Sequence, residues 1–112
     1  MQRAGSDWVP CACVGPAGLA RFRAAVGEAA TNHSHRCLVV NYHRGTVHQI
    51  PVNNGHMSPV AGYHRESDMC LVLDTNAWRY PPIWVETQLL WEAMCKRTNI
   101  GVPRGFLLVR GG

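Results

Sequence analysis

Residues 55–74 read GHMSPVAGYHRESDMCLVLD and contain two strand-like runs separated by a polar turn. The first run, 56–64, mixes apolar with small and polar residues, whereas the second run, 69–73, is almost wholly apolar. The residues between them, 65–68, are polar and of the kind that close a hairpin. This pattern predicts an antiparallel hairpin whose second strand is central in a sheet and covered on both faces.

A histidine opens the first strand of this hairpin, and an aspartate follows the second strand. Because the open ends of paired strands lie side by side, we expect His56 and Asp74 to approach each other there. In enzymes with a thiol nucleophile, a carboxylate fixes the tautomer of the histidine that deprotonates the thiol. The pattern therefore indicates two members of a Cys-His-Asp triad. The alternative interpretation is a turn histidine and an aspartate that caps a helix.

The register of the hairpin decides whether this pair can form. An ideal two-residue turn at residues 66–67 places Asp74 opposite Pro59, which leaves His56 three residues away and on the other face. Proline cannot donate to the ladder and often marks a bulge, and one inserted residue would bring both side chains to the same face. The catalytic hypothesis therefore predicts an irregularity near residues 57–59.

Outward from the hairpin, helical and strand-like patterns are distinguishable. We expect a helix of about 13 residues after Pro16, because Leu19, Phe22 and Val26 recur at helical spacing. A run of β-branched and aromatic residues predicts a buried strand at 37–42.

The remaining segments are assigned in the same way. An apolar stripe predicts a helix at 87–96, and residues 106–109 are expected to form the last strand. Residues 44–45 are expected to turn the chain, and the two prolines in 80–82 indicate a loop. Residues 1–15 lack a clear period and are interpreted as an irregular or strand-like beginning.

Length and composition fit one soluble domain. The 112 residues are 46% apolar and 16% charged. No apolar run approaches the roughly 20 residues that a helix needs to cross a bilayer. Neither a repeat nor a linker divides the chain, so we expect residues 1–112 to form a single α+β unit with an antiparallel sheet and flanking helices.

Charge and cysteine content limit the partners and the compartment. The net charge of +4 is spread over single arginines, so the sequence predicts neither a nucleic-acid partner nor a membrane partner. The first residues lack the charged start and apolar stretch of a secretory signal, and five cysteines are an odd number. We therefore expect free thiols and a cytoplasmic protein.

Several motifs, in order along the chain, resemble the phytochelatin synthase family, also called glutathione γ-glutamylcysteinyltransferases. They are 55–64 (GHMSPVAGYH), 71–74 (LVLD), 80–85 (YPPIWV) and 89–94 (LLWEAM), together with 42–45 (YHRG), 104–108 (RGFLL) and the region of Cys11 and Cys13. The likeness covers nearly the entire chain.

This resemblance implies a papain-like cysteine peptidase fold and a Cys-His-Asp triad, with His56 as the general base and Asp74 as the orienting carboxylate. It implies transfer of a γ-glutamylcysteinyl group from one glutathione to another, with loss of glycine, in heavy-metal detoxification. Tyr80 and Arg79 are the expected substrate contacts. The implied partners are glutathione, phytochelatin thiol peptides and heavy-metal thiolates. We expect no metal ligand and no tightly bound cofactor, although cadmium or another heavy-metal ion assists the family's activity.

Two departures from the family pattern matter. The family's nucleophilic cysteine lies upstream, on an N-terminal lobe that this chain is not expected to contain. The chain is therefore interpreted as the C-terminal half of the catalytic domain, inactive alone. Cys13 precedes a helix and imitates a nucleophile, but its position matches a non-nucleophilic cysteine. Ala77 stands where the family usually has arginine, and Arg79 could substitute for it.

Two interpretations from other classes remain open. One is a thiol and imidazole metal binder. Its ligands would come from His33, His35 and Cys37, with Cys11, Cys13, His43 or His48 nearby. The other is a non-catalytic module that pairs with an N-terminal half supplied as a separate chain.

Overall fold

The computed structural model describes residues 5–10, 16–31, 36–98, 100–102 and 104–110. Its elements in chain order are β1 (Gly5–Pro10), α1 (Pro16–Ala29), β2 (Arg36–His43), α2 (Arg44–His48), β3 (Gly55–His64), β4 (Met69–Val72), β5 (Ile83–Glu86), α3 (Thr87–Cys95) and β6 (Gly105–Arg110). These elements confirm the predicted α+β class.

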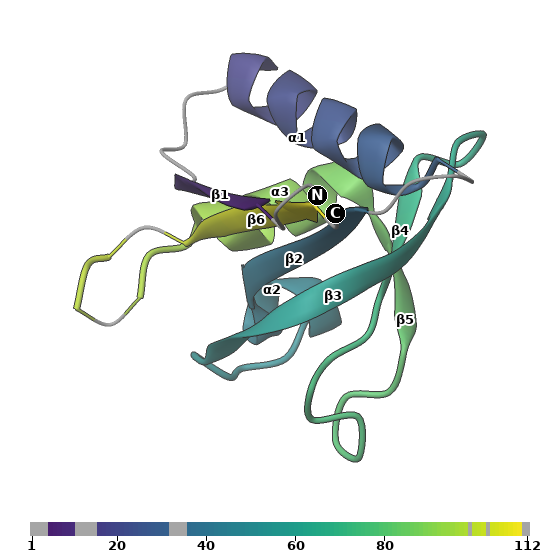
Figure 1. Cartoon of the computed structure of the whole chain (residues 1–112). Coiled ribbons are helices and arrows are strands. Elements are labelled where there is room, and N and C mark those ends of the chain that lie inside the picture. The colour runs from purple at the N-terminus through teal and green to yellow at the C-terminus, as the bar shows by residue number, and fades with distance from the viewer. Residues whose placement is uncertain (1–4, 11–15, 32–35, 99, 103, 111–112) are drawn as a thin grey trace.

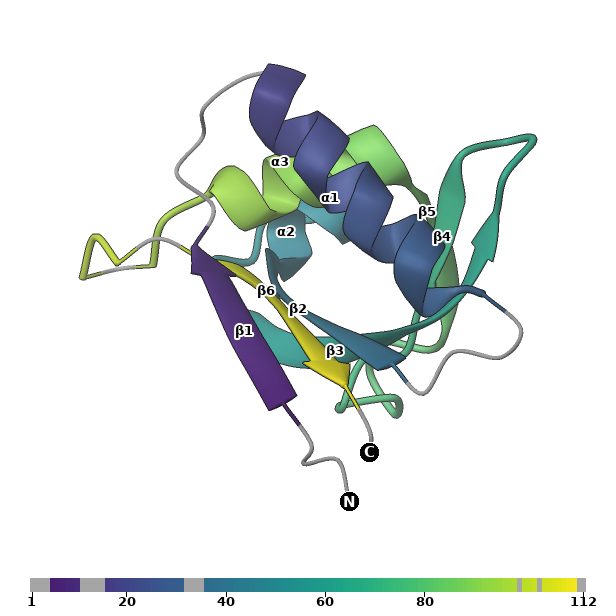
Figure 2. The same ribbon diagram turned by 45° about the horizontal axis from the view of Figure 1, so that its top comes forward.

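The six strands form one sheet in the order β1-β6-β2-β3-β4-β5, and every neighbouring pair is antiparallel. Helices α1 and α3 lie over one face of this sheet, and α2 lies beside α3 (Figures 1 and 2). The antiparallel sheet with flanking helices was predicted from the sequence, and the structure confirms it.

The core lies between the helices and the covered face of the sheet. Alternate residues of β2 are fully buried on this face, among them Leu38 and Val40, as expected for a central strand. Phe22 of α1 is also fully buried. Its ring centroid lies 5.8 Å from that of Trp91 in α3 and 5.3 Å from that of Phe106 in β6. One aromatic side chain therefore joins both helices to the sheet.

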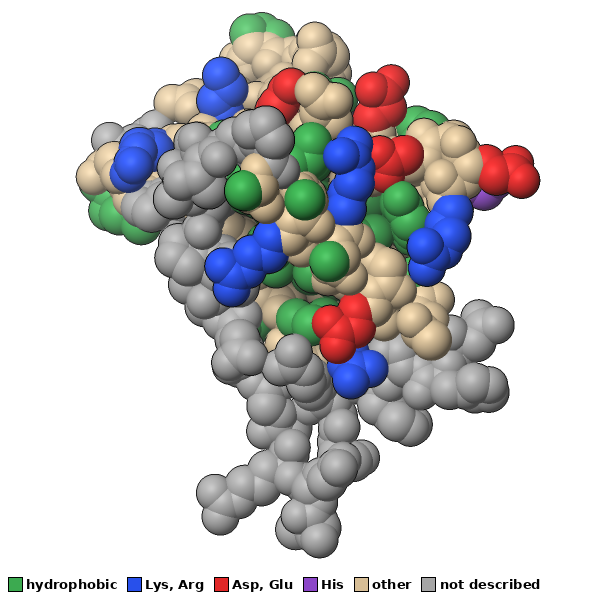
Figure 3. All heavy atoms as spheres, turned by 90° about the horizontal axis from the view of Figure 1, so that it is seen from above, with side chains coloured by type: hydrophobic (Ala, Val, Ile, Leu, Met, Phe, Trp, Pro, Cys, Tyr) green, Lys and Arg blue, Asp and Glu red, His purple; other side chains and the backbone are tan. Residues whose placement is uncertain are grey.

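The outer face of the helical layer carries charges of both signs. Figure 3 shows basic and acidic side chains interspersed over this face, with small apolar side chains between them. One contact on this face ties the helix to the β3–β4 hairpin, because Arg23 pairs with Asp68 at 2.8 Å. This ion pair therefore holds α1 against the β3–β4 hairpin.

The hairpin contains the bulge that the catalytic hypothesis requires, but at a different place. Gly62 pairs with Leu71 whereas Val60 pairs with Val72, so Ala61 is the extra residue. The expected position near 57–59 is wrong, because the carbonyl of Pro59 still accepts a hydrogen bond from the Leu73 N–H at 3.0 Å. A proline lacks the backbone N–H but keeps its carbonyl, so Pro59 still takes part in the hydrogen-bond ladder as an acceptor.

The bulge has the predicted effect on the two candidate residues. Continued by one residue, the register places Asp74 opposite Ser58, which shares a face with His56. Without the inserted residue, Asp74 would face the other side of the sheet. The structure therefore places both candidates on the same face and at the same end of the hairpin.

Two elements differ from the expectations. Residues 44–45 were expected to turn the chain but begin helix α2, because the His43 ring accepts a hydrogen bond from the Thr46 N–H at 3.1 Å and caps the helix. Strand β5 was not predicted, and β1 falls within the segment interpreted as irregular or strand-like. Both are short and lie at the two edges of the sheet.

Replacing Phe22 with alanine should lower the free energy of unfolding by about 3–5 kcal/mol, because the cavity lies where α1, α3 and β6 meet. Urea denaturation followed by circular dichroism measures this loss. The neighbouring Arg21→Ala substitution, at an exposed position, is the control and should change stability by less than about 0.5 kcal/mol. Equal effects of the two substitutions would contradict the proposed core.

Candidate functional site

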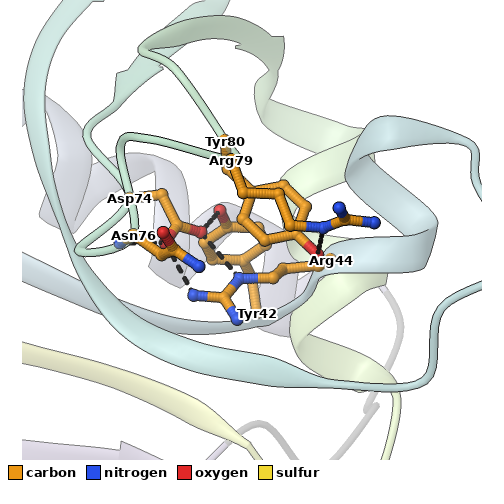
Figure 4. Close-up of polar contacts among 6 residues, drawn as sticks. All are labelled: Tyr42, Arg44, Asp74, Asn76, Arg79 and Tyr80. Carbon is orange, nitrogen blue, oxygen red and sulfur yellow. Dashed lines mark hydrogen bonds and ion pairs between the residues drawn. The ribbon is translucent and has the colours of Figure 1, made fainter.

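Asp74 follows β4 and is the centre of a buried polar cluster (Figure 4). Arg44 donates to it twice, from Nε to Oδ2 at 2.9 Å and from Nη2 to Oδ1 at 2.7 Å. The Tyr42 hydroxyl also donates to Oδ2, and the Asn76 N–H donates to Oδ1 at 2.8 Å. A carboxylate has about four acceptor positions, so these donors saturate Asp74.

The electrostatics of the cluster follow from these contacts. Burial alone would raise the pKa of the Asp74 carboxyl, but hydrogen bonds from Arg44, Tyr42 and the Asn76 N–H outweigh it and lower the pKa to about 2. The carboxylate in turn raises the pKa of Arg44. Burial and the bond to Asp74 raise the pKa of the Tyr42 hydroxyl. At neutral pH the cluster therefore holds one buried ion pair and one neutral hydroxyl donor.

The predicted substrate residues Tyr80 and Arg79 lie beside this cluster. The ring of Tyr80 is buried, with the Arg44 guanidinium carbon 4.5 Å from its centroid and the His48 ring 5.0 Å away. Arg79 is exposed, and its Nε donates to the Tyr80 hydroxyl at 3.2 Å, which lowers the pKa of that hydroxyl. Of these two, only Arg79 presents a charge to solvent.

His56 is exposed at the start of β3 and lies directly opposite Tyr42 in the register. Within the residues that the structure describes, no hydrogen bond joins its ring to Asp74. The two predicted catalytic residues thus share a face and a sheet end but are not hydrogen-bonded to each other. The capping alternative for Asp74 is also not what the structure shows, because its carboxylate accepts from Asn76 in a local turn and the next helix begins at Thr87.

A second basic residue, to which the sequence analysis gave no role, lies at the same sheet end. Arg104 is 5% exposed, and its Nη1 donates to the Asn41 side chain at 2.9 Å. Its Nε has no partner, and no acidic side chain among the described residues pairs with it. Asn41 and Gly55, which Arg104 contacts, alternate with Tyr42 and His56, so Arg104 lies toward the opposite face. Burial lowers the pKa of its guanidinium.

The sequence contains a signal for both arginines, although a weak one. Arg44 and Arg104 each stand beside a glycine at the end of a strand, within motifs quoted above for the family resemblance. Only the fold shows that one pairs with Asp74 and that the other lacks an anionic partner.

The metal-binding interpretation names residues both inside and outside the described ranges. Cys11, Cys13, His33 and His35 lie outside the described residues. Within the described ranges, no group of three or more His, Cys, Asp or Glu side chains is placed to hold a metal ion. His43 caps α2 and also contacts the Asn53 side chain at 3.0 Å through Nε2, while the His48 ring packs against the Tyr80 ring at a tilt of 34°.

The described cysteines are distributed away from His56. Cys37 is exposed at the start of β2, five residues from the position opposite His56. Cys70 is buried in β4 with its sulfur 3.3 Å from the Thr87 hydroxyl, and burial raises the pKa of its thiol. Cys95 ends α3.

In the described part of the chain, no helix is both long and apolar enough to cross a membrane.

The sequence of the chain is similar to those of known proteins. The family model described as phytochelatin synthase matches residues 8–106. The chain is 43% identical over 89 residues to glutathione gamma-glutamylcysteinyltransferase 1 of Triticum aestivum, covering 79% of this chain and 17% of the relative. It is 45% identical over 73 residues to glutathione gamma-glutamylcysteinyltransferase 1 of Arabidopsis thaliana, covering 64% and 15%.

A fungal relative is more distant. The glutathione gamma-glutamylcysteinyltransferase of Schizosaccharomyces pombe is 30% identical over 98 residues, covering 87% of this chain and 23% of the relative. The chain therefore spans less than a quarter of the length of these curated relatives.

Asp74 should make stability depend on pH in the acid range. Its pKa of about 2 in the folded state lies below the unfolded value, so its stabilisation is complete above about pH 5 and disappears as the pH falls toward 2. We expect the free energy of unfolding of the wild type to exceed that of Asp74→Asn by about 2 kcal/mol at pH 6. This difference should disappear by pH 2. Urea titrations of both proteins across this range test it, and a constant gap would contradict the assigned contacts.

Gly55→Ala should destabilise the chain by about 1–3 kcal/mol, because the added methyl meets a backbone oxygen and the buried Arg104 side chain. A Cβ at this position would lie 2.2 Å from Arg104 Nη1 and 2.4 Å from the Tyr42 carbonyl oxygen. Gly62→Ala in the same strand is the matched control, since its Cβ would meet nothing closer than 3.6 Å. Thermal denaturation compares the two, and an equal or larger loss for Gly62→Ala would refute the close approach at Gly55.

Proposed function

Because the chain belongs to the phytochelatin synthase family, we propose that it forms the part of a glutathione γ-glutamylcysteinyltransferase that supplies the general base and its carboxylate. The observation that carries this proposal is the placement of His56 and an ionised, buried Asp74 on one face and at one end of the same hairpin. The chain would be the C-terminal half of a papain-like catalytic domain, with the nucleophilic cysteine on another segment.

The proposed reaction has two halves. His56 removes the proton of the nucleophilic thiol, and the thiolate attacks the carbonyl carbon of the cysteinyl-glycine bond. Breaking that bond releases glycine, whose amine takes the proton from His56, and leaves a thioester. A second thiol peptide then attacks the thioester through its amine, which forms a new amide and frees the thiol. Water in place of the peptide would give hydrolysis.

His56 can serve this role only after a small rearrangement. Asp74 already accepts four hydrogen bonds, so a bond from the His56 ring needs one donor to give way. Tyr42 is the natural candidate, because its hydroxyl is neutral and lies opposite His56 in the register, whereas the two bonds from Arg44 are charge-assisted. The exposed ring of His56 is free to turn toward the carboxylate.

The substrate class agrees with the unpaired charges near the site. Glutathione carries two carboxylates, and a buried guanidinium without an anionic partner is costly unless a ligand supplies one. We place one carboxylate at Arg104, reached around the start of β3, and the other at Arg79. Tyr80 would contact the substrate through the hydroxyl that Arg79 holds.

The same proposal covers cofactors and compartment. We expect no tightly bound cofactor. Cadmium or another heavy-metal ion would enter as a thiolate complex of glutathione, that is, with the substrate. The reaction consumes a reduced thiol peptide and is therefore expected in the cytoplasm.

Glutathione should bind the isolated chain weakly and reversibly, in the millimolar range, since only part of its site is present. In ¹H–¹⁵N NMR titrations we expect shifts at the amides of Gly55 and His56 and at the Arg104 side chain. Arg104→Met should abolish these shifts, while Arg21→Lys, on the far side of α1, should leave them unchanged. Absence of any shift around residues 55, 56 and 104 would contradict the proposed substrate.

Incubation of the same chain with glutathione and cadmium should release no glycine, because no described cysteine lies beside His56. Amino acid analysis of the reaction mixture measures this. Release that disappears in His56→Ala would show that the nucleophile is within these residues, and the division of the site between two segments would then be wrong.

A further inference from the structure

Arg44 contacts both the segment before His56 and the carboxylate of Asp74. Its backbone N–H donates to the carbonyl of Asn54 at 2.9 Å, two residues before His56. Its side chain holds both oxygens of Asp74. One residue therefore contacts the segment that leads into the histidine strand and also the carboxylate that must serve this histidine.

The contact with Asp74 fixes orientation as well as position. Two parallel bonds, from Nε to one oxygen and from Nη2 to the other, stop the carboxylate from rotating about its own axis. The guanidinium of Arg44 is nearly buried, so solvent does not compete for these bonds. Lysine has a single ammonium group and cannot reproduce this two-point contact.

Arg44 also supports the proposed substrate contact. Its guanidinium carbon lies 4.5 Å from the ring centroid of Tyr80, and the His48 ring lies 5.0 Å from the same ring. Figure 4 shows Tyr80 and Asp74 next to the Arg44 side chain, both on the loop that follows β4. Movement of Arg44 would therefore disturb the carboxylate and the substrate contact together.

Helix α2 holds Arg44 in place. It is the first residue of α2, and the preceding His43 caps the helix by accepting from the Thr46 N–H. The next residue, Gly45, packs so closely that a Cβ there would lie 2.2 Å from the carbonyl oxygen of Val52. The backbone that carries the guanidinium is thus fixed against the 50–54 segment.

From these contacts we infer that Arg44 is a positioning residue of the transferase, which sets the separation and orientation of His56 and Asp74 and supports Tyr80. This inference rests on the proposed function. Arg44 touches neither the substrate carbonyl nor the thiol, so it acts only through the residues that it holds.

Arg44→Lys keeps the charge but loses the two-point contact, and it is the test variant. By ¹³C NMR, the pKa of Asp74 should rise from about 2 toward its ordinary value of 3.8. Hydrogen exchange at the Asn76 N–H should accelerate at least about tenfold. In the proposed function the exposed His56 ring exchanges with Tyr42 at the carboxylate, so its ¹⁵N shifts should report a changed tautomer ratio. Loss of a merely structural ion pair would not alter this ratio. Arg21→Lys is the matched control and should change none of these signals.

Asp74→Asn is measured by the same methods as Arg44→Lys. Together the two variants distinguish a failure of the Arg44 inference from a failure of the proposed function. If Asp74→Asn alters the His56 tautomer ratio but Arg44→Lys does not, the proposed pair stands and the positioning role of Arg44 is refuted. If neither substitution alters it, His56 is not coupled to Asp74 and the proposed function fails as well. A melting curve for each variant confirms that the signals come from folded protein.

Discussion

The ion pair between Arg44 and Asp74 is the contact on which the candidate site depends. Both groups are nearly buried, and a buried charge left without its partner is destabilising. The net gain from such a pair is small, because both ions lose hydration. Its effect is therefore less to stabilise the fold than to permit only one arrangement of the loop after β4. The position of Tyr80 follows from this arrangement.

A single inserted residue supplies the second constraint. With Ala61 in the bulge, Asp74 faces the side of the sheet that Tyr42 and His56 also face. Without it, the carboxylate would face away from Tyr42, and the cluster could not form. The local geometry of β3 thus decides a contact more than ten residues away along the chain. Such bulges occur often beside functional sites for this reason.

Much of the fold could be predicted, because its signals are local. The spacing of Phe22 with its neighbours indicates α1, and the apolar run of β4 indicates an inner strand. The expected burial of β4 on both faces is wrong, because only its alternate residues are fully buried and the helices cover one face. Helix α2 was missed because Gly45 and Thr46 are poor helix formers and the helix depends on its cap, His43. Strand β5 has four residues and follows two prolines, so its pairing with β4 left little pattern.

The candidate site was only partly visible in the sequence, since its contacts are distant along the chain. His56 and Asp74 could be named from their places in the hairpin. That Arg44 would occupy the acceptor positions of the Asp74 carboxylate could not be predicted. An outer strand illustrates a different consequence of the same topology. Among the strands of the described ranges, β5 has a neighbour on one side only, so its outer backbone groups form a margin of the sheet. Its shortness, the two prolines before it and the exposed Glu86 at its end discourage edge-to-edge polymerisation with other molecules.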